Sequence, residues 1–142
     1  MRCRFFRHVH TFSGHAVAAA AANTVINIKT REKLMPKSLK NGEYLQAGLK
    51  AAIGDHPIVG QIRGVGSWHA VDFTSDRKTK AAFEDDTVKS IARRMLDLGV
   101  IASAIGTSIE VAPALIVTHN DLDRTVDTLK KAIDDVAALS AR

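Results

Sequence analysis

Apolar residues in the C-terminal half of the chain recur at the spacing of two amphipathic helices. The first helix is expected over residues 85–99, with Gly99 as its stop. The second is expected to begin near Thr118 and Asp121, which resemble a capping box. Its apolar stripe comprises Leu122, Val126, Leu129, Ile133 and Val136. Each pattern predicts one buried face and one solvated face.

The N-terminal half predicts two further helices. Residues 15–28 begin with six alanines in eight positions, and Ser13 or Thr11 can cap this helix because a hydroxyl accepts from its first free amides. A helix with so little side-chain bulk can approach a neighbour closely, so we expect it to be buried. A second helix is predicted from about Pro36, which suits a first helical turn, to Gly54.

Four short strands are predicted between these helices. Residues 58–62 and 68–73 form one pair around the glycine-marked turn RGVG, and residues 100–102 and 108–112 form a second pair around Gly106. The order is helix, helix, strand, strand, helix, strand, strand, helix. This order predicts an α/β fold in which the helices lie on a small, mostly antiparallel sheet.

The composition is that of a globular protein and limits its compartment. Of the 142 residues, 46% are hydrophobic and 25% are charged. Cys3 is the only cysteine, so a disulfide within the chain is impossible, and no stretch approaches the roughly 20 apolar residues of a membrane helix. The N-terminal residues also lack the continuous apolar run of a secretory signal. We therefore expect a cytoplasmic protein without a membrane partner.

The net charge of +5 raises the question of nucleic-acid binding. Arg2, Arg4 and Arg7 gather at the N-terminus, and five further cations lie between residues 29 and 40. Such clusters can bind phosphate backbones, but they more often form a solvated face, and no recognition motif accompanies them here. We do not expect nucleic acid to be the partner. The alternative to an enzyme stays open: a catalytically inactive binding or interaction module, nucleic-acid binding included.

Histidines near the N-terminus are candidates for metal binding or catalysis. His8, His10 and His15 follow the spacing H-x-H-x4-H, but no carboxylate that would complete a metal site lies nearby, so we predict no metal. Ser13 beside His15 resembles a nucleophile with its base. Neighbouring side chains at a helix start rarely point at each other, and no acid is placed to orient the histidine. No catalytic residue is therefore assigned.

The polar stretch before the alanine-rich helix has a second interpretation, as an anion site. Thr11, Ser13 and Gly14 precede a helix whose first amides are unpaired and whose dipole is positive at that end. A phosphate at this point would gain hydroxyl and amide hydrogen bonds. From the residues alone, simple capping of the helix by Thr11 or Ser13 is the preferred interpretation.

The stretch HVHTFSGHAVAAAAAN resembles the pattern HG-x-T-[YF]-SGHP-x-x-x-A-A-A of class III aminotransferases, pyridoxal-phosphate enzymes that include the omega-transaminases. The resemblance continues through NGEYLQAGLK, HPIVGQIRGVGSWHAVDF and GVIASAIGTSIEVAPALIVT to the final helix, in the family's order. It implies the C-terminal small domain of a fold-type-I pyridoxal-phosphate-dependent transferase. Residues 1–14 would then be a remnant of the large domain's cofactor-interface loop, and residues 15–142 a helix followed by the small domain.

The resemblance also implies a reaction and its components. Family members move an amino group between an amine or amino acid and a 2-oxo acid, use pyridoxal 5'-phosphate and form homodimers. The threonine that matches Thr11 binds the cofactor phosphate of the partner subunit. The lysine that holds the cofactor lies well upstream of that threonine, so we expect this chain to be the C-terminal third of an aminotransferase and to be inactive alone.

Three positions depart from the family pattern. Ala16 and Ala114 replace two prolines, which are tolerable backbone changes. Ser103 stands where many members carry an arginine that binds the substrate carboxylate. Ser103 is therefore a candidate substrate-binding residue, and its identity leaves the class of amino donor open.

Overall fold

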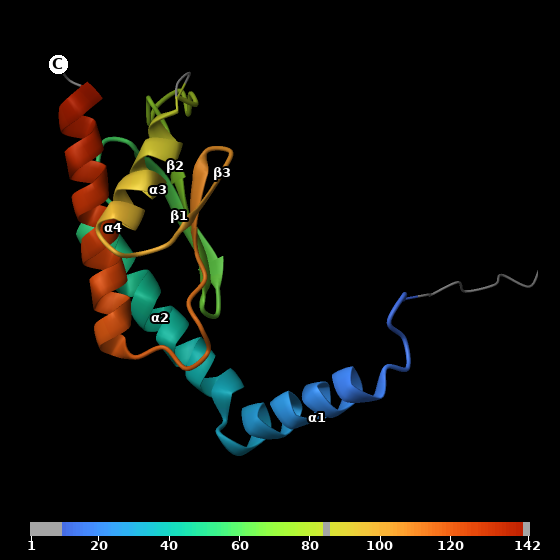
Figure 1. Ribbon diagram of the computed structural model, residues 1–142. Coiled ribbons are helices and arrows are strands. Elements are labelled where there is room, and N and C mark those ends of the chain that lie inside the picture. The colour runs from blue at the N-terminus through green and yellow to red at the C-terminus, as the bar shows by residue number, and fades with distance from the viewer. Residues whose placement is uncertain (1–9, 84–85, 141–142) are drawn as a thin grey trace, which may run out of the picture. The chain divides into compact units, whose positions relative to one another are not determined.

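The computed structural model describes residues 10–83 and 86–140, which belong to two compact units. The first unit ends at Leu34 and the second begins at Met35. Within its described residues, the first unit holds the helix α1 (Ala16–Arg31). Figure 1 shows the elements in chain order.

Helix α1 begins one residue after a histidine cap. The Nδ1 atom of His15 accepts a hydrogen bond from the amide of Ala18 at 3.2 Å. The prediction that Thr11 or Ser13 caps this helix is therefore wrong. The physical reason is a turn at residues 11–14, which ends directly before His15 and leaves the imidazole as the side chain that meets the first free amides.

None of the residues of α1 is buried, so the prediction of a buried helix is wrong for this chain. Val17, Val25 and Ile26 have exposed fractions of 73%, 54% and 58%. An alanine-rich face is buried only where another element approaches it, and among its described residues the first unit holds no second element to pack on α1. The helix ends at Arg31, three residues beyond the predicted end, and Lys33 then adopts a φ of 51°.

The second unit combines helices with a four-stranded sheet. Its helices are α2 (Leu34–Ile53), whose first residue closes the first unit, α3 (Thr87–Asp97) and α4 (His119–Ser140), and its strands are β1 (Val59–Val65), β2 (Trp68–Phe73), β3 (Ser103–Ile105) and β4 (Ser108–Val111). The strand order is β1-β2-β4-β3, and every neighbouring pair is antiparallel. The predicted α/β fold with helices on a small antiparallel sheet is confirmed.

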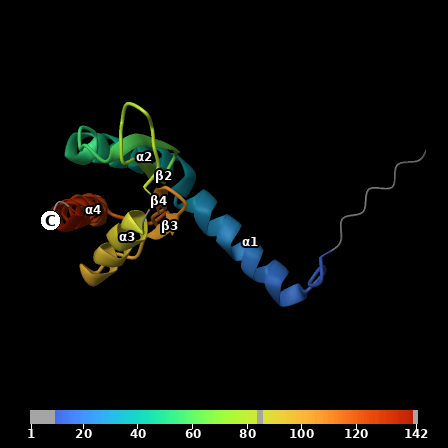
Figure 2. The ribbon, with the colours of Figure 1, turned by 90° about the horizontal axis from the view of Figure 1, so that it is seen from above.

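One face of the sheet packs against the helices and forms the core. Val71 of β2 pairs with Ile109 of β4, and neither side chain is exposed. Helices α3 and α4 lie side by side in both views of the molecule (Figures 1 and 2). The stripe predicted for α4 is buried at all five positions, Leu122, Val126, Leu129, Ile133 and Val136. The amphipathic pattern therefore identified this face of α4 correctly.

The start of α4 also follows the predicted capping box. The amide of Asp121 donates to Oγ1 of Thr118 at 3.2 Å, and the Asp121 carboxylate accepts from the Thr118 amide at 3.1 Å. Two orphan backbone donors are thus satisfied reciprocally.

Helix α2 begins at Leu34, two residues before the predicted start at Pro36. Pro36 still lies in the first turn of the helix, where its missing amide hydrogen costs nothing.

Two of the strands differ from the prediction in where they begin or end. Strand β1 continues to Val65, so the hairpin turn is the two residues Gly66 and Ser67 rather than the predicted RGVG. Strand β3 lies at residues 103–105 instead of 100–102. The reason lies at the end of α3, where the amide of Val100 still donates to the carbonyl of Met95 at 2.9 Å. This bond is the 6→1 hydrogen bond of a Schellman motif, which ends the helix. The amide of Val100 is therefore bonded to the helix and does not begin a strand.

The β1–β2 turn packs against α2 at a point where two glycines meet. A Cβ atom on Gly42 would lie 1.8 Å from the carbonyl oxygen of Gly66, so no side chain fits on the helix there. Beside this contact, Oγ of Ser67 lies 2.7 Å from Oγ of Ser38 and donates to the Ser38 carbonyl at 3.0 Å. The hairpin end is thus fixed on the helix, which stabilises the register of β1 and β2.

Candidate functional site

Thr11 lies in the turn that leads into α1. The amide of Ser13 donates to the carbonyl of His10 at 3.0 Å, and Gly14 has a φ of +77° that glycine adopts without strain. The Thr11 side chain is exposed, and its hydroxyl makes no hydrogen bond to the residues that the structure describes. Because His15 supplies the cap, this hydroxyl is available to a ligand.

The surroundings of Thr11 suit an anion. The sequence from residue 10 to residue 31 contains no Asp or Glu, and the first turn of α1 carries no acidic side chain. The positive end of the helix dipole lies at the same end of α1. A phosphate at this turn would therefore meet hydroxyl donors and no repelling carboxylate. The role of Thr11 stays a prediction.

Ser103 lies in the second unit, at the start of β3, and is exposed. Because side chains alternate along a strand, Ser103 belongs to the face of the sheet opposite the core. We call this face the outer face; its members are Gln61, Arg63, Val65, Trp68, Ala70, Asp72, Ser103, Ile105, Ser108 and Glu110. Thr11 and Ser103 thus belong to different units of the chain.

One row of the outer face crosses all four strands. Arg63 pairs with Ala70, Ala70 with Glu110, and Glu110 with Ser103. Paired residues on one face of a sheet have Cβ atoms about 4.5–5.5 Å apart. Ser103 therefore lies directly beside the side chain of Glu110.

A second group on the outer face is held together by hydrogen bonds. Arg63 donates to both carboxylate oxygens of Asp72, with Nε at 2.8 Å and an Nη at 3.1 Å, and Ser108 donates to the same carboxylate. The Arg63 guanidinium, helped by the Ser108 hydroxyl, holds the pKa of Asp72 below its usual range despite partial burial. Asp72 in turn raises the pKa of Arg63. Both groups stay charged at neutral pH.

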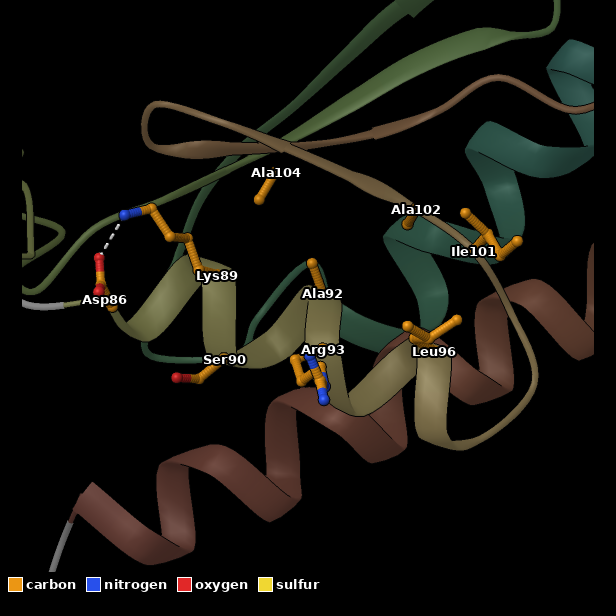
Figure 3. Close-up of a pocket in the computed structure, with 9 residues that line it drawn as sticks. All are labelled: Asp86, Lys89, Ser90, Ala92, Arg93, Leu96, Ile101, Ala102 and Ala104. Carbon is orange, nitrogen blue, oxygen red and sulfur yellow. Dashed lines mark hydrogen bonds and ion pairs between the residues drawn. The ribbon is translucent and has the colours of Figure 1, made fainter.

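A groove beside β3 does not include Ser103. It runs between α3 and residues 101–104, and Figure 3 shows Ala92, Leu96, Ile101, Ala102 and Ala104 along it. Lys89 and Arg93 add positive charge at this groove, and Lys89 is paired with Asp86 at 2.6 Å. Ala102 and Ala104 point into the groove, so Ser103 between them points to the other face. The groove and the Ser103 surface are two separate places.

Other candidates from the sequence have less structural support. The residues described contain no group of three or more His, Cys, Asp or Glu side chains able to hold a metal. His8 of the H-x-H-x4-H pattern lies outside the described residues, as do Cys3 and the arginines at positions 2, 4 and 7. No described helix is both long enough and apolar enough to cross a membrane.

The sequence analysis did not select Glu110 or Arg63. The signal for Glu110 was the alternation in SIEV, where one charged residue lies between Ile109 and Val111, both of which are buried. An alternating strand places such a residue on the solvent face. The alternation could not show that Ser103 is the cross-strand neighbour of Glu110. That pairing depends on the β3–β4 register, and therefore on where β3 begins.

Comparison with known proteins gives a consistent result along nearly the whole chain. A family model described as aminotransferase class-III matches residues 2–133. An uncharacterised aminotransferase of Sinorhizobium fredii is 38% identical over 136 residues, which cover 92% of this chain and 29% of that protein. The putrescine–pyruvate aminotransferase of Pseudomonas aeruginosa is 34% identical over 135 residues, with 94% of this chain and 29% of the relative covered.

Solved structures agree with the sequence comparison. The omega-transaminase of Pseudomonas jessenii in complex with PMP superposes with a TM-score of 0.87 at 34% identity, covering 93% of this chain and 29% of that one. An aminotransferase of Bacillus anthracis gives a TM-score of 0.86 at 30% identity, with coverages of 92% and 31%. The chain thus spans about 30% of the length of the relatives that it matches.

Proposed function

Because the chain belongs to the class III aminotransferase family, we propose that it is the C-terminal portion of a pyridoxal-phosphate-dependent aminotransferase. Such an enzyme moves an amino group between an amine or amino acid and a 2-oxo acid. The observation that carries this proposal is the match of both units, over 93% of the chain, to the omega-transaminase of P. jessenii. The catalytic lysine would come from the part of the enzyme that this chain does not cover.

The residues around Thr11 fit the phosphate of the cofactor. A hydroxyl that is free of hydrogen bonds to the described residues, a glycine turn and a stretch without carboxylates suit a dianion chemically. We propose that Thr11 donates a hydrogen bond to the phosphate of a cofactor held by the partner subunit of a homodimer. The bound cofactor supplies the electron sink that amino-group transfer requires. Thr11 would bind the phosphate and so help to orient the cofactor.

The outer face of the sheet is proposed as the substrate side of this unit. Ser103 is exposed there and can donate one hydrogen bond, but it cannot form the bidentate pair that an arginine makes with a carboxylate. Simple amines should therefore be accepted at least as well as α-carboxylated donors. Ser103→Arg should shift the preference toward the carboxylated donors.

A chimera tests the proposal. The full chain is joined in frame to the segments of the P. jessenii omega-transaminase that it does not match, and alanine formed from pyruvate and 1-butylamine is measured. We expect turnover that depends on added pyridoxal phosphate. The same P. jessenii segments without this chain serve as the control. A folded chimera that binds pyridoxal phosphate and forms no alanine from any amine would contradict the proposal.

A further inference from the structure

Glu110 carries a carboxylate that no described residue binds directly, although its charge adds weakly to the effect of Asp72 in raising the pKa of Arg63. It is half-buried at the centre of the outer face, in β4, which has a strand on either side. Its carboxylate makes no hydrogen bond or ion pair with the residues that the structure describes. The nearest cation on the outer face, Arg63, is already bound through two nitrogens by Asp72. The three groups together carry one net negative charge.

The side chains beside this carboxylate on the neighbouring strands are small. The residues paired with Glu110 across the sheet are Ala70, which is buried, and Ser103, which is exposed, so the side toward Ser103 is open to solvent. Ser103 contributes a hydroxyl that can accept a hydrogen bond from an ammonium. Trp68 lies diagonally across from Glu110 on the same face and is 59% exposed, so its ring is available to an alkyl chain or a cation.

These features recognise a positive charge rather than a negative one. A carboxylate with a hydroxyl beside it and an aromatic ring nearby matches a primary ammonium on a short alkyl chain. A ligand carboxylate in the same place would meet the like charge of Glu110 without the free guanidinium needed to offset it. The outer face thus has the reverse polarity of a carboxylate site.

We infer that Glu110 is a specificity-determining residue that binds the distal ammonium of a diamine donor, with Ser103 as its neighbour. This inference rests on the proposed function, because it places the unreactive end of the donor on the outer face. Donors that carry a second ammonium are preferred over donors of equal length that carry a distal carboxylate. Acceptors with a distal carboxylate, such as 2-oxoglutarate, are used less well than pyruvate.

The test compares three donors of similar length in the chimera: 1,4-diaminobutane, 1-butylamine and 4-aminobutanoate. Glu110→Gln keeps the size of the side chain and removes its charge. We expect kcat/KM for 1,4-diaminobutane to fall about tenfold, the change expected when one charge-assisted hydrogen bond is lost. The value for 1-butylamine should change less than about twofold, and that for 4-aminobutanoate should rise. Glu43→Gln, at an exposed position of α2, is the matched control.

The outcomes separate this inference from the proposed function. Absence of turnover with all three donors in the unaltered chimera contradicts the proposed function. Turnover with equal losses for all three donors in Glu110→Gln assigns Glu110 a structural role and overturns the inference. If the chimera does not fold, the intact P. jessenii enzyme is tested with serine and glutamate at its positions matching Ser103 and Glu110. Its preference should then move toward 1,4-diaminobutane, and an unchanged preference overturns the inference.

Discussion

Helices α1 and α4 both carry apolar residues at helical spacing, and only α4 buries them. All five stripe residues of α4 lie in the core of the second unit, whereas no residue of α1 is buried. The apolar residues of α4 are large, so they fill a core between elements of the same unit. Those of α1 are mostly alanine, which suits close approach of another surface. The contrast supports our proposal that α1 packs on a part of the aminotransferase that this chain does not cover.

The largest expected effect is a difference in stability between two matched isoleucine-to-alanine substitutions, one in α4 and one in α1. Ile133 of α4 is fully buried and Ile26 of α1 is 58% exposed. Ile133→Ala should cost about 2–5 kcal/mol because it leaves a cavity in the core. Ile26→Ala should change stability by less than about 0.7 kcal/mol, since the gain in helix propensity is of that order. Urea unfolding followed by the fluorescence of Trp68 measures both, and equal losses would contradict the distinction.

The second effect concerns association of the isolated chain. Val17, Val25 and Ile26 expose apolar surface on α1, and exposed apolar patches promote self-association. We expect the chain to bind a hydrophobic dye and to form oligomers whose size rises with concentration. Val25→Lys together with Ile26→Glu should reduce both signals. Leu139→Lys, an exposed apolar position of α4, is the control and should change them less. A monodisperse monomer without dye binding would contradict this expectation.

The third effect tests Thr11 in the chimera. Thr11→Ala removes a hydrogen bond to a charged group, worth about 1.5–3 kcal/mol, so affinity for pyridoxal phosphate should fall roughly ten- to a hundredfold. Thr11→Ser keeps the hydroxyl and should lose much less. Because His15 caps α1, Thr11→Ala should leave the helicity of the isolated chain unchanged, whereas His15→Ala should lower it. Unchanged cofactor affinity in Thr11→Ala would remove Thr11 from the site.

The fourth effect is a pH dependence of the free energy of unfolding, and it arises from His69 in the second unit. His69 is 2% exposed, and its Nδ1 has no hydrogen-bond partner among the described residues. Burial, with a smaller contribution from Lys50, lowers the pKa of His69 in the folded state. The unfolded chain therefore takes up a proton near pH 6.5 that the folded chain does not, and stability falls as the pH drops below that value, by at most about 1.4 kcal/mol per pH unit.

His69→Leu isolates this contribution. Unfolding free energies measured between pH 5 and pH 8 should fall less steeply on the acid side in the variant, while the slope near pH 8 stays the same. The substitution leaves the contact of His56 Nε2 with Asp134, at 3.5 Å, in place in both proteins. Parallel curves for the two proteins would show that His69 does not carry the effect.

Much of the fold could be predicted from the sequence, because most of it is local. The stripe of α4, its capping box and the glycine that ends α3 are each read from residues a few positions apart. Strand β3 was misplaced because Val100 and Ile101 are apolar and look like a strand. Instead, the amide of Val100 donates to the Met95 carbonyl in the Schellman motif at Gly99 that ends α3. The turn at Gly106 would have placed β3 correctly, since a two-residue turn pairs Ile105 with Ser108.

The site was less predictable than the fold. Thr11 and Ser103 came from a resemblance to a family, and no contact among the described residues identifies either one. The cap at His15 was missed because its imidazole reaches the amide of Ala18 only after the preceding turn has formed. Glu110 was missed because the role proposed for it depends on the residue across the sheet, and cross-strand neighbours follow from register rather than from local sequence.

The central claim is that this chain is one part of an aminotransferase and depends on the remainder for its chemistry. The most direct measurement treats the isolated chain and the chimera with pyridoxal phosphate, reduces both with borohydride, and maps the labelled residues by mass spectrometry while amino transfer to pyruvate is assayed. We expect one stoichiometrically labelled lysine and turnover in the chimera, with that lysine in the P. jessenii segment. The isolated chain should show neither. A single labelled lysine in the isolated chain, together with transaminase turnover, would contradict the account.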